Sequence, residues 1–200
     1  MATKCTDQES MYKDINFCKG SKSLPGTRPY VYGVSKRDIM LWPTLPGDKA
    51  ADLKAKVTYV GDFKLADGKF FHKVGMIDNQ GQIQVESQGN EGAKTFKNTA
   101  NIAMHGTEED VTGYIYELNN DDMVYLVPQR NGKCRVIGNE CFTTSTELSQ
   151  DTGQASTDTN QTIAKVTCDD EYPAPFYAGK IHTEDGDIDA TTCKPVEAGV

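Results

Sequence analysis

The sequence contains no long hydrophobic run. No apolar stretch approaches the length of about 18 residues that marks a membrane-spanning helix. Residues 1–20 alternate between polar and apolar types and lack the apolar centre of a secretory leader. We therefore expect a chain that neither spans a membrane nor enters the secretory route.

Hydrophobic residues and positive charges are both scarce. Only 37% of the residues are apolar, and the mean hydropathy is −0.57, so a large core is not expected. The 29 acidic residues outnumber the 21 basic ones and give a net charge of −8. Proteins that bind nucleic acid through its phosphates carry an excess of positive charge on the binding surface. The negative net charge therefore disfavours DNA binding by the whole surface, and only a local basic patch could bind DNA.

Catalytic and metal-binding motifs are absent as well. The histidines His72, His105 and His182 each stand alone, and no glycine-rich loop has the spacing of a nucleotide site. The six cysteines include no CxxC pair, and we expect most of their thiols to be reduced and packed. The sequence thus predicts no catalytic, cofactor-binding or metal-ligating residues, and we do not expect an enzyme.

One acidic run imitates a calcium loop in part. Asp185, Asp187 and Asp189 occupy alternate positions, as in the first half of such a loop. The sixth position is Ala190, where the turn needs glycine, and the twelfth is Val196, where a bidentate glutamate belongs. We therefore predict no metal site here.

Most of what the sequence does contain is typical of β-structure. Strands are predicted over residues 28–34, 57–63, 69–74, 82–87, 95–104, 123–127, 133–137, 141–148 and 162–168. The dipeptide Asp67-Gly68 predicts a hairpin between the second and third of these runs, and Asn131-Gly132 predicts another, with a type I′ turn. Residues 43–56 and 149–161 are predicted loops, since turn-forming and polar residues dominate them.

A single amphipathic helix is expected at about residues 107–119. Thr107 starts a sequence that resembles a capping box, with acidic residues in the first turn. Apolar residues then recur at helical spacing at Val111, Tyr114, Ile115 and Leu118. This stripe is too narrow for a helix that is buried all round, so we expect it to lie half exposed across a sheet.

These elements predict one domain over residues 1–200. Residues 1–28 have no periodicity and are expected to form an N-terminal arm, residues 28–182 a β-rich core, and residues 183–200 a poorly ordered acidic tail. The predicted fold class is mainly β (α+β): an antiparallel β-sandwich or barrel with one helix, extended arms and hairpins. Arms and long hairpins reach neighbouring copies more readily than they build pockets.

Three segments resemble structural proteins encoded by phages and prophages of Bacteroidetes. They are residues 32–39 (Tyr-Gly-Val-Ser-Lys-Arg-Asp-Ile), residues 86–96 (Glu-Ser-Gln-Gly-Asn-Glu-Gly-Ala-Lys-Thr-Phe), and Ile137-Gly138-Asn139 leading to residues 149–153 (Ser-Gln-Asp-Thr-Gly). The order of sheet, single helix, hairpin and further sheet is similar to that of phage tail tube proteins, and the resemblance covers about residues 28–182.

The resemblance implies a virion subunit that assembles in the cytoplasm of a host bacterium. It implies rings, commonly hexameric, which stack into a hollow tube, contact other tail proteins and let DNA pass during ejection without specific binding. An acidic wall would repel phosphates, which fits the net charge of this chain.

Two other classes of protein stay open. A β-sandwich carbohydrate-binding or adhesin module would use exposed aromatic residues such as Trp42, Tyr172, Phe176 and Tyr177. A small hydrolase with a carboxylate site would need a pocket with convergent acids, which sequence spacing does not reveal.

Overall fold

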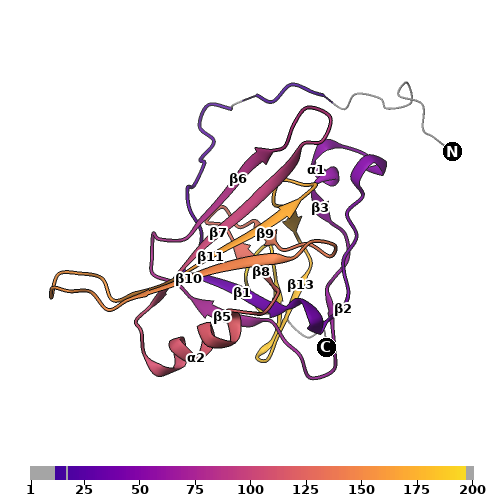
Figure 1. Ribbon diagram of the computed structural model, residues 1–200. Coiled ribbons are helices and arrows are strands. Elements are labelled where there is room, and N and C mark those ends of the chain that lie inside the picture. Colours follow the sequence, from indigo (N-terminus) through magenta and orange to yellow (C-terminus); the bar gives the residue numbers. More distant parts are fainter. Residues whose placement is uncertain (1–11, 17, 197–200) are drawn as a thin grey trace.

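The computed structural model describes residues 12–16 and 18–196 and is mainly β. Strands account for 42% of the structure and helices for 11%, and nearly all strand pairs are antiparallel. The predicted fold class is therefore confirmed, as a layered sandwich (Figure 1). Among the described residues, no helix has the length and apolar character needed to cross a bilayer.

A six-stranded sheet forms the central layer. Its strands, in spatial order, are β3 (Thr58–Tyr59), β12 (Phe176–Tyr177), β9 (Cys134–Ile137), β8 (Met123–Pro128), β1 (Tyr30–Ser35) and β5 (His72–Gly75). β8 is buried along its whole length, as a strand covered on both faces must be. β5 lies at one margin and pairs only with β1.

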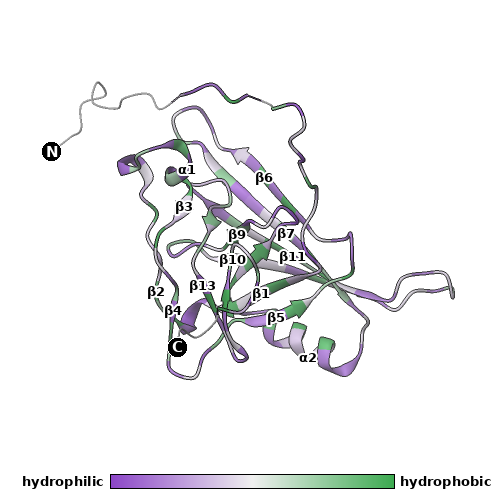
Figure 2. Ribbon diagram, turned by 180° about the vertical axis from the view of Figure 1, so that it is seen from behind, coloured by the Kyte–Doolittle hydropathy of each residue, from purple (hydrophilic) through white to green (hydrophobic). Residues whose placement is uncertain are grey.

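A four-stranded antiparallel sheet packs on one face of the central layer. Its order is β10 (Thr144–Asp151), β11 (Gln161–Asp170), β7 (Thr95–His105) and β6 (Gln82–Gln88). Inward side chains such as Ile102, Ala164 and Val166 meet Tyr125 and Val127 of the central sheet in the first hydrophobic core. Polar residues predominate along β6, whereas β1 is largely hydrophobic (Figure 2).

Two small sheets cover the opposite face of the central layer. They are β2 (Ile39–Leu41) with β4 (Lys64–Leu65), and β13 (Lys180–Thr183) with β14 (Gly186–Asp189). Phe63, Phe71 and Ile181 pack there against Leu126 and Val136 in a second core. The side chains of β8 alternate between the two cores, so this strand links all three layers.

The helix α2 (Glu109–Leu118) connects β7 of the outer sheet to β8 of the central sheet. Leu118 is buried while Val111, Tyr114 and Ile115 are half-buried, so the apolar stripe and the half-exposed position are as predicted. The predicted capping box is wrong. The N-cap residue is Glu108, which makes no side-chain cap bond, and Thr107 instead accepts a bond from the Thr112 hydroxyl through its carbonyl, at 3.1 Å.

The hairpin predicted around Asp67-Gly68 is also wrong. These residues do form a turn, in which the Lys69 amide donates to the Ala66 carbonyl over 3.0 Å. The strands on either side of it pair elsewhere, β3 with β12 and β5 with β1. The second predicted hairpin, β8–β9, is confirmed, but residues 129–133 connect the two strands and only Gly132 among them has a positive φ, of 82°, so the turn is not type I′.

Two predictions about irregular segments need correction. The predicted loop at 43–56 contains a 3-10 turn, η2 (Gly47–Lys49), and a short helix, α1 (Leu53–Lys56). Asp52 caps the N-terminus of this helix, because its carboxylate accepts a hydrogen bond from the Ala55 amide at 2.7 Å. The helix count of one is therefore wrong. A second 3-10 turn, η1 (Lys36–Asp38), follows Ser35, which makes no side-chain cap bond to it.

The two ends of the chain behave differently. The N-terminal arm, as far as it is described, contains no strand or helix before residue 27. The expected poorly ordered tail is wrong for residues 183–196, because β14 pairs with β13, Ile188 bridges to Pro195, and Ala190 is fully buried. Residues 1–11, 17 and 197–200 lie outside the described residues.

Candidate functional site

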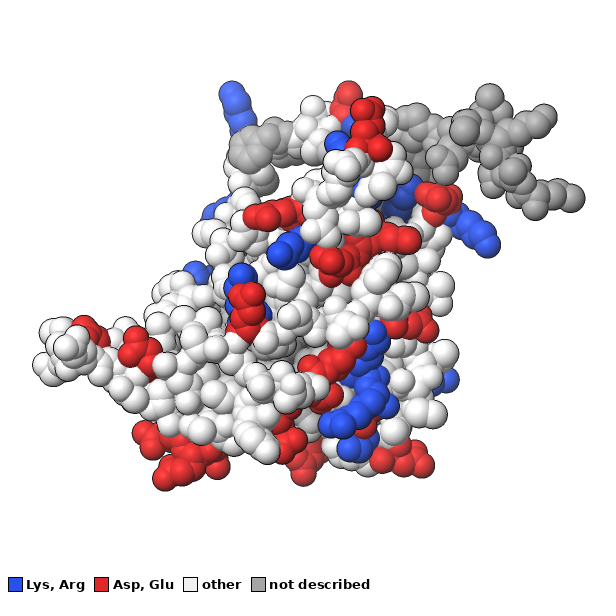
Figure 3. All heavy atoms as spheres, viewed as in Figure 1, with Lys and Arg blue, Asp and Glu red and all other residues white. Residues whose placement is uncertain are grey.

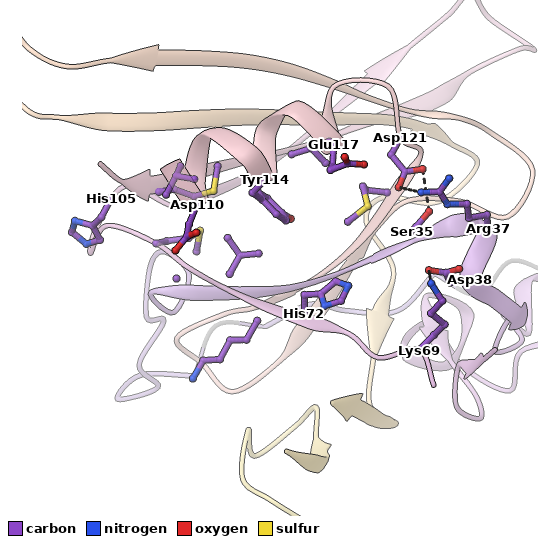
Figure 4. Close-up of a pocket in the computed structure, with 18 residues that line it drawn as sticks. Ser35, Arg37, Asp38, Lys69, His72, His105, Asp110, Tyr114, Glu117 and Asp121 are labelled. Atoms are coloured by element: carbon purple, nitrogen blue, oxygen red, sulfur yellow. Dashed lines mark hydrogen bonds and ion pairs between the residues drawn. The ribbon is translucent and has the colours of Figure 1, made fainter. Parts of the chain in front are cut away.

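A groove of about 800 Å³ lies between the marginal strand β5 and the helix α2 (Figure 4). Its floor is apolar and rich in methionine. The floor residues are Val74, Met76, Met104, Val111, Leu118 and Met123. Three of them are methionines, whose flexible side chains can adapt to an incoming group.

The helical period explains which residues of α2 line this groove. Asp110, Tyr114 and Glu117 recur at intervals of three and four residues, and Asp121 continues the same line just beyond the helix. Tyr114 reaches inward, and its hydroxyl lies 3.3 Å from that of Tyr125. Burial raises the pKa of both phenols above its ordinary value, so the two hydroxyls stay protonated well into the alkaline range.

Ion pairs close one end of the groove. Arg37 Nη2 lies 3.4 Å from Asp121 Oδ2, and Lys69 Nζ lies 3.4 Å from Asp38 Oδ2. The Ser35 hydroxyl also donates to Asp121, over 3.0 Å. These partly exposed pairs order η1 beside the C-terminal end of α2 and contribute little net stability.

The helix side of the groove carries unpaired negative charge. Asp110 and Glu117 are exposed, and within the described chain no basic side chain lies within 4.0 Å of either carboxylate. Figure 3 shows acidic side chains gathered at the end of the molecule where α2 lies. The groove thus combines an apolar floor with one acidic rim.

The structure brings two of the three histidines into this groove. His72 of β5 and His105 of β7 line it, although they are distant in sequence. His182 lies elsewhere: its Nδ1 is 2.7 Å from Asp187 Oδ1, and its ring rests on Phe70. In the described part of the chain, no three His, Cys, Asp or Glu side chains are arranged to hold a metal ion.

The calcium-like run lies in the β13–β14 hairpin. Asp187 contacts His182, and Asp189 accepts bonds from the amides of Thr191 and Thr192 at 2.8 and 2.7 Å. These bonds lower the pKa of Asp189. The two carboxylates therefore organise the hairpin and the turn that follows it.

A second cleft, of about 510 Å³, is aromatic and acidic. Trp42, Tyr59 and Tyr172 line it together with Glu140 and Asp170. Asp170 is buried, which raises its pKa, and it accepts a bond from the Tyr172 amide at 3.0 Å. Its carboxylate is thus used to hold the backbone of the residues that follow it.

Of the four aromatic residues considered for carbohydrate binding, two share this cleft. Trp42 and Tyr172 line it, whereas Phe176 is covered by the Arg135 guanidinium, 4.1 Å from its ring centroid. Tyr177 is buried, and its hydroxyl donates to the Lys180 carbonyl over 2.6 Å. The expectation that Tyr177 is exposed is wrong.

The outward face of the four-stranded sheet is largely polar, with a hollow of about 420 Å³ beside Ala103 and Ile163. Register and alternation place these side chains on it: Gln82, Gln84, Glu86, Gln88, Lys97, Thr99, Asn101, Ser145, Glu147, Ser149, Ile163, Lys165, Thr167 and Asp169. Lys165 pairs with Glu147 at 3.0 Å, and the Gln88 amide donates to Asp169 over 2.8 Å. With Asp151 at the end of β10, four acids against two lysines make this face slightly negative.

The β10–β11 hairpin projects from the body of the protein (Figure 1). Asp151 pairs with Gln161, and the connecting residues 152–160 are exposed except for Gly153, which is half-buried. The Asp158 carboxylate accepts from the amides of Gln154 and Ala155 at 2.9 and 2.8 Å, so the loop is folded on itself. The ribbon exposes most of its polar groups to solvent.

Fold and surfaces together define a mainly β, layered antiparallel sandwich with one adaptable groove and open sheet margins. Comparisons with protein-family models, with curated proteins and with solved structures find no match to this chain.

Proposed function

We propose that the chain is a virion structural subunit, and specifically a tail tube protein that assembles with copies of itself. The observation that carries the proposal is the projecting β10–β11 hairpin. Its tip, residues 152–160, contacts little of its own chain, and an ordered protruding ribbon costs conformational entropy that a neighbouring copy would offset by burying it.

The margins of the four-stranded sheet support the same proposal. β10 and β6 are its outermost strands, and each pairs with one neighbour only. Unpaired strand margins are templates for pairing with another chain. A cyclic arrangement in which copies meet along these margins closes into a ring and leaves no free edge, and rings stack head to tail into a tube.

The polar outward face of this sheet suits a wall along which DNA slides. It carries carboxylates of Glu86, Glu147 and Asp169, and its lysines lie opposite acids, so it offers phosphates no cluster of free cations. Slight negative potential repels the DNA backbone. In this proposal the protein is assembled in the cytoplasm of a host bacterium, becomes part of the virion and contacts other tail proteins.

Sedimentation of the full chain tests the proposal. Across a wide concentration range the mass should rise from 22.0 kDa to that of a ring, commonly a hexamer, or a larger assembly. A variant with residues 152–160 replaced by Asn-Gly should fold equally well, because Asp151 and Gln161 are already paired and two residues close such a hairpin. This variant should lose assembly. A mass that stays at 22.0 kDa would refute the proposal.

A carbohydrate-binding module is the second candidate function, favoured by the aromatic cleft of Trp42 and Tyr172. Trp42 is the single tryptophan of the chain, so its fluorescence reports on this cleft alone. Its ring already packs edge-on against Phe63, with centroids 5.2 Å apart, which limits its use as a stacking platform. A saturable fluorescence change on adding oligosaccharides would favour this candidate over the first.

A further inference from the structure

We propose that the groove between β5 and α2 binds the segment Tyr12–Asn16 of a second copy of this chain as an added β-strand. This inference rests on the proposed self-assembly, and the docked segment would be one of the contacts between copies. An extended segment that enters a gap between a strand margin and a helix gains backbone hydrogen bonds on one side and side-chain contacts on the other.

The margin of β5 offers the backbone groups. β5 forms its strand pairing with β1 alone. On the side that faces β1, the Met76 amide also donates to the Pro29 carbonyl over 2.8 Å. Backbone groups of successive residues point to opposite sides of a strand, so Lys73 and Gly75 direct their amides and carbonyls away from β1. These are the groups that an added strand would pair with.

The segment Tyr12–Asn16 places one basic and one apolar side chain where they match the acidic rim and the apolar floor of the groove. In an extended strand Lys13 and Ile15 point to the same side. Ile15 is 90% exposed in the described structure, so burying it over the methionine-rich floor is favourable. Lys13 would then face the unpaired carboxylates of Asp110 and Glu117.

We assign the occupant to another copy. Figures 1 and 2 place residues 12–16 at the end of the molecule opposite to α2 and β5. In this structure the arm of a chain therefore lies away from its own groove, which leaves the groove open to the arm of a neighbouring copy.

A peptide with the sequence of residues 8–20 tests the docking step on the isotope-labelled full-length chain by NMR. The amide signals of Lys73, Gly75 and α2 should shift on titration. A peptide carrying Ile15→Asp should bind about tenfold more weakly or worse, because a charge replaces a buried apolar group. A control peptide carrying Asn16→Ser, on the other side of the strand, should bind as the parent does.

Variants of the full chain identify the groove. Gly75→Pro removes an outward amide where a new Cβ meets no atom within 4 Å, so it should weaken peptide binding strongly while leaving the denaturation midpoint near that of the parent. Glu117→Lys should also weaken binding. The matched charge change Glu184→Lys, in the β13–β14 turn, should leave it unchanged.

The outcomes separate docking from the proposed function. Signal shifts confined to other surfaces, or equal binding of the Ile15→Asp peptide, would overturn the docking proposal even if the chain forms rings. Peptide binding in the groove by a chain that forms dimers or irregular assemblies but no rings would support the docking and refute the tail tube proposal, whereas a chain that stays at 22.0 kDa would overturn both.

Discussion

Leu118 is the residue of α2 that ties the helix to the first core. Its side chain is 3% exposed and packs with residues of both large sheets. Replacement by Ala should lower the free energy of unfolding by about 2–5 kcal/mol, because the transfer and cavity costs of a buried leucine add. Glu109→Ala, on the exposed side, should change it by no more than about 0.5 kcal/mol. Denaturant melts compare the two, and equal stabilities would contradict the packing of α2.

The cysteines should divide by burial when they react with thiol reagents. Cys18 and Cys141 are exposed, whereas Cys134 and Cys168 are buried. Burial raises the pKa of Cys168 to about 11 and that of Cys134 further, so at pH 8 both thiols stay protonated and unreactive.

Mass spectrometry after brief alkylation at pH 8 should therefore find the label on Cys18 and Cys141. Cys134 and Cys168 should react only once the protein unfolds. Fast labelling of Cys134 in the folded protein would contradict its buried position on β9.

At the scale of elements, two glycines should respond to alanine with opposite signs. Gly132 ends the β8–β9 connection at φ 82°, and a Cβ there would lie 3.3 Å from the Thr191 carbonyl oxygen. Gly132→Ala should therefore destabilise the protein by about 1–2 kcal/mol. Gly113 lies within α2 with no atom near its Cβ, so Gly113→Ala should stabilise by up to about 1 kcal/mol. Thermal melts check both signs, and the reverse order would contradict the two backbone assignments.

Elements that pair with their sequence neighbours could be predicted from the sequence. The alternation of residues 82–87 and the Asn131-Gly132 turn specify local pairing, and β6–β7 and β8–β9 are indeed hairpins. The strands at 57–63 and 69–74 instead pair with β12 and β1, which are remote in sequence. Turn chemistry at Asp67-Gly68 fixes only the local chain direction, so it does not reveal those partners.

The groove could be predicted only in part. The spacing of Val111, Tyr114 and Leu118 identified the side of α2 that faces the protein. Its opposite wall, from β5, and the floor methionines Met76, Met104 and Met123 come from three separate segments. No short pattern links them, because the sandwich alone brings them together.

At the scale of the whole molecule, the slightly negative sheet face should keep DNA mobile. Assembled protein should not retain DNA in co-sedimentation at low salt. A variant with Glu86→Lys and Glu147→Lys should retain it, since each change removes a negative charge from this face and adds a positive one. The same charge change at Glu184 and Asp185, in the β13–β14 turn, should have a smaller effect. Equal retention by both variants would contradict the assignment of this face to the lumen.

Electron microscopy of the concentrated full-length chain would show directly whether it assembles as a tail tube. We expect closed rings or stacked tubes with a central channel, in which the four-stranded sheets meet along β6 and β10 and line the channel. A field of separate 22.0 kDa particles at every concentration, or assemblies whose channel is lined by another surface, would contradict it.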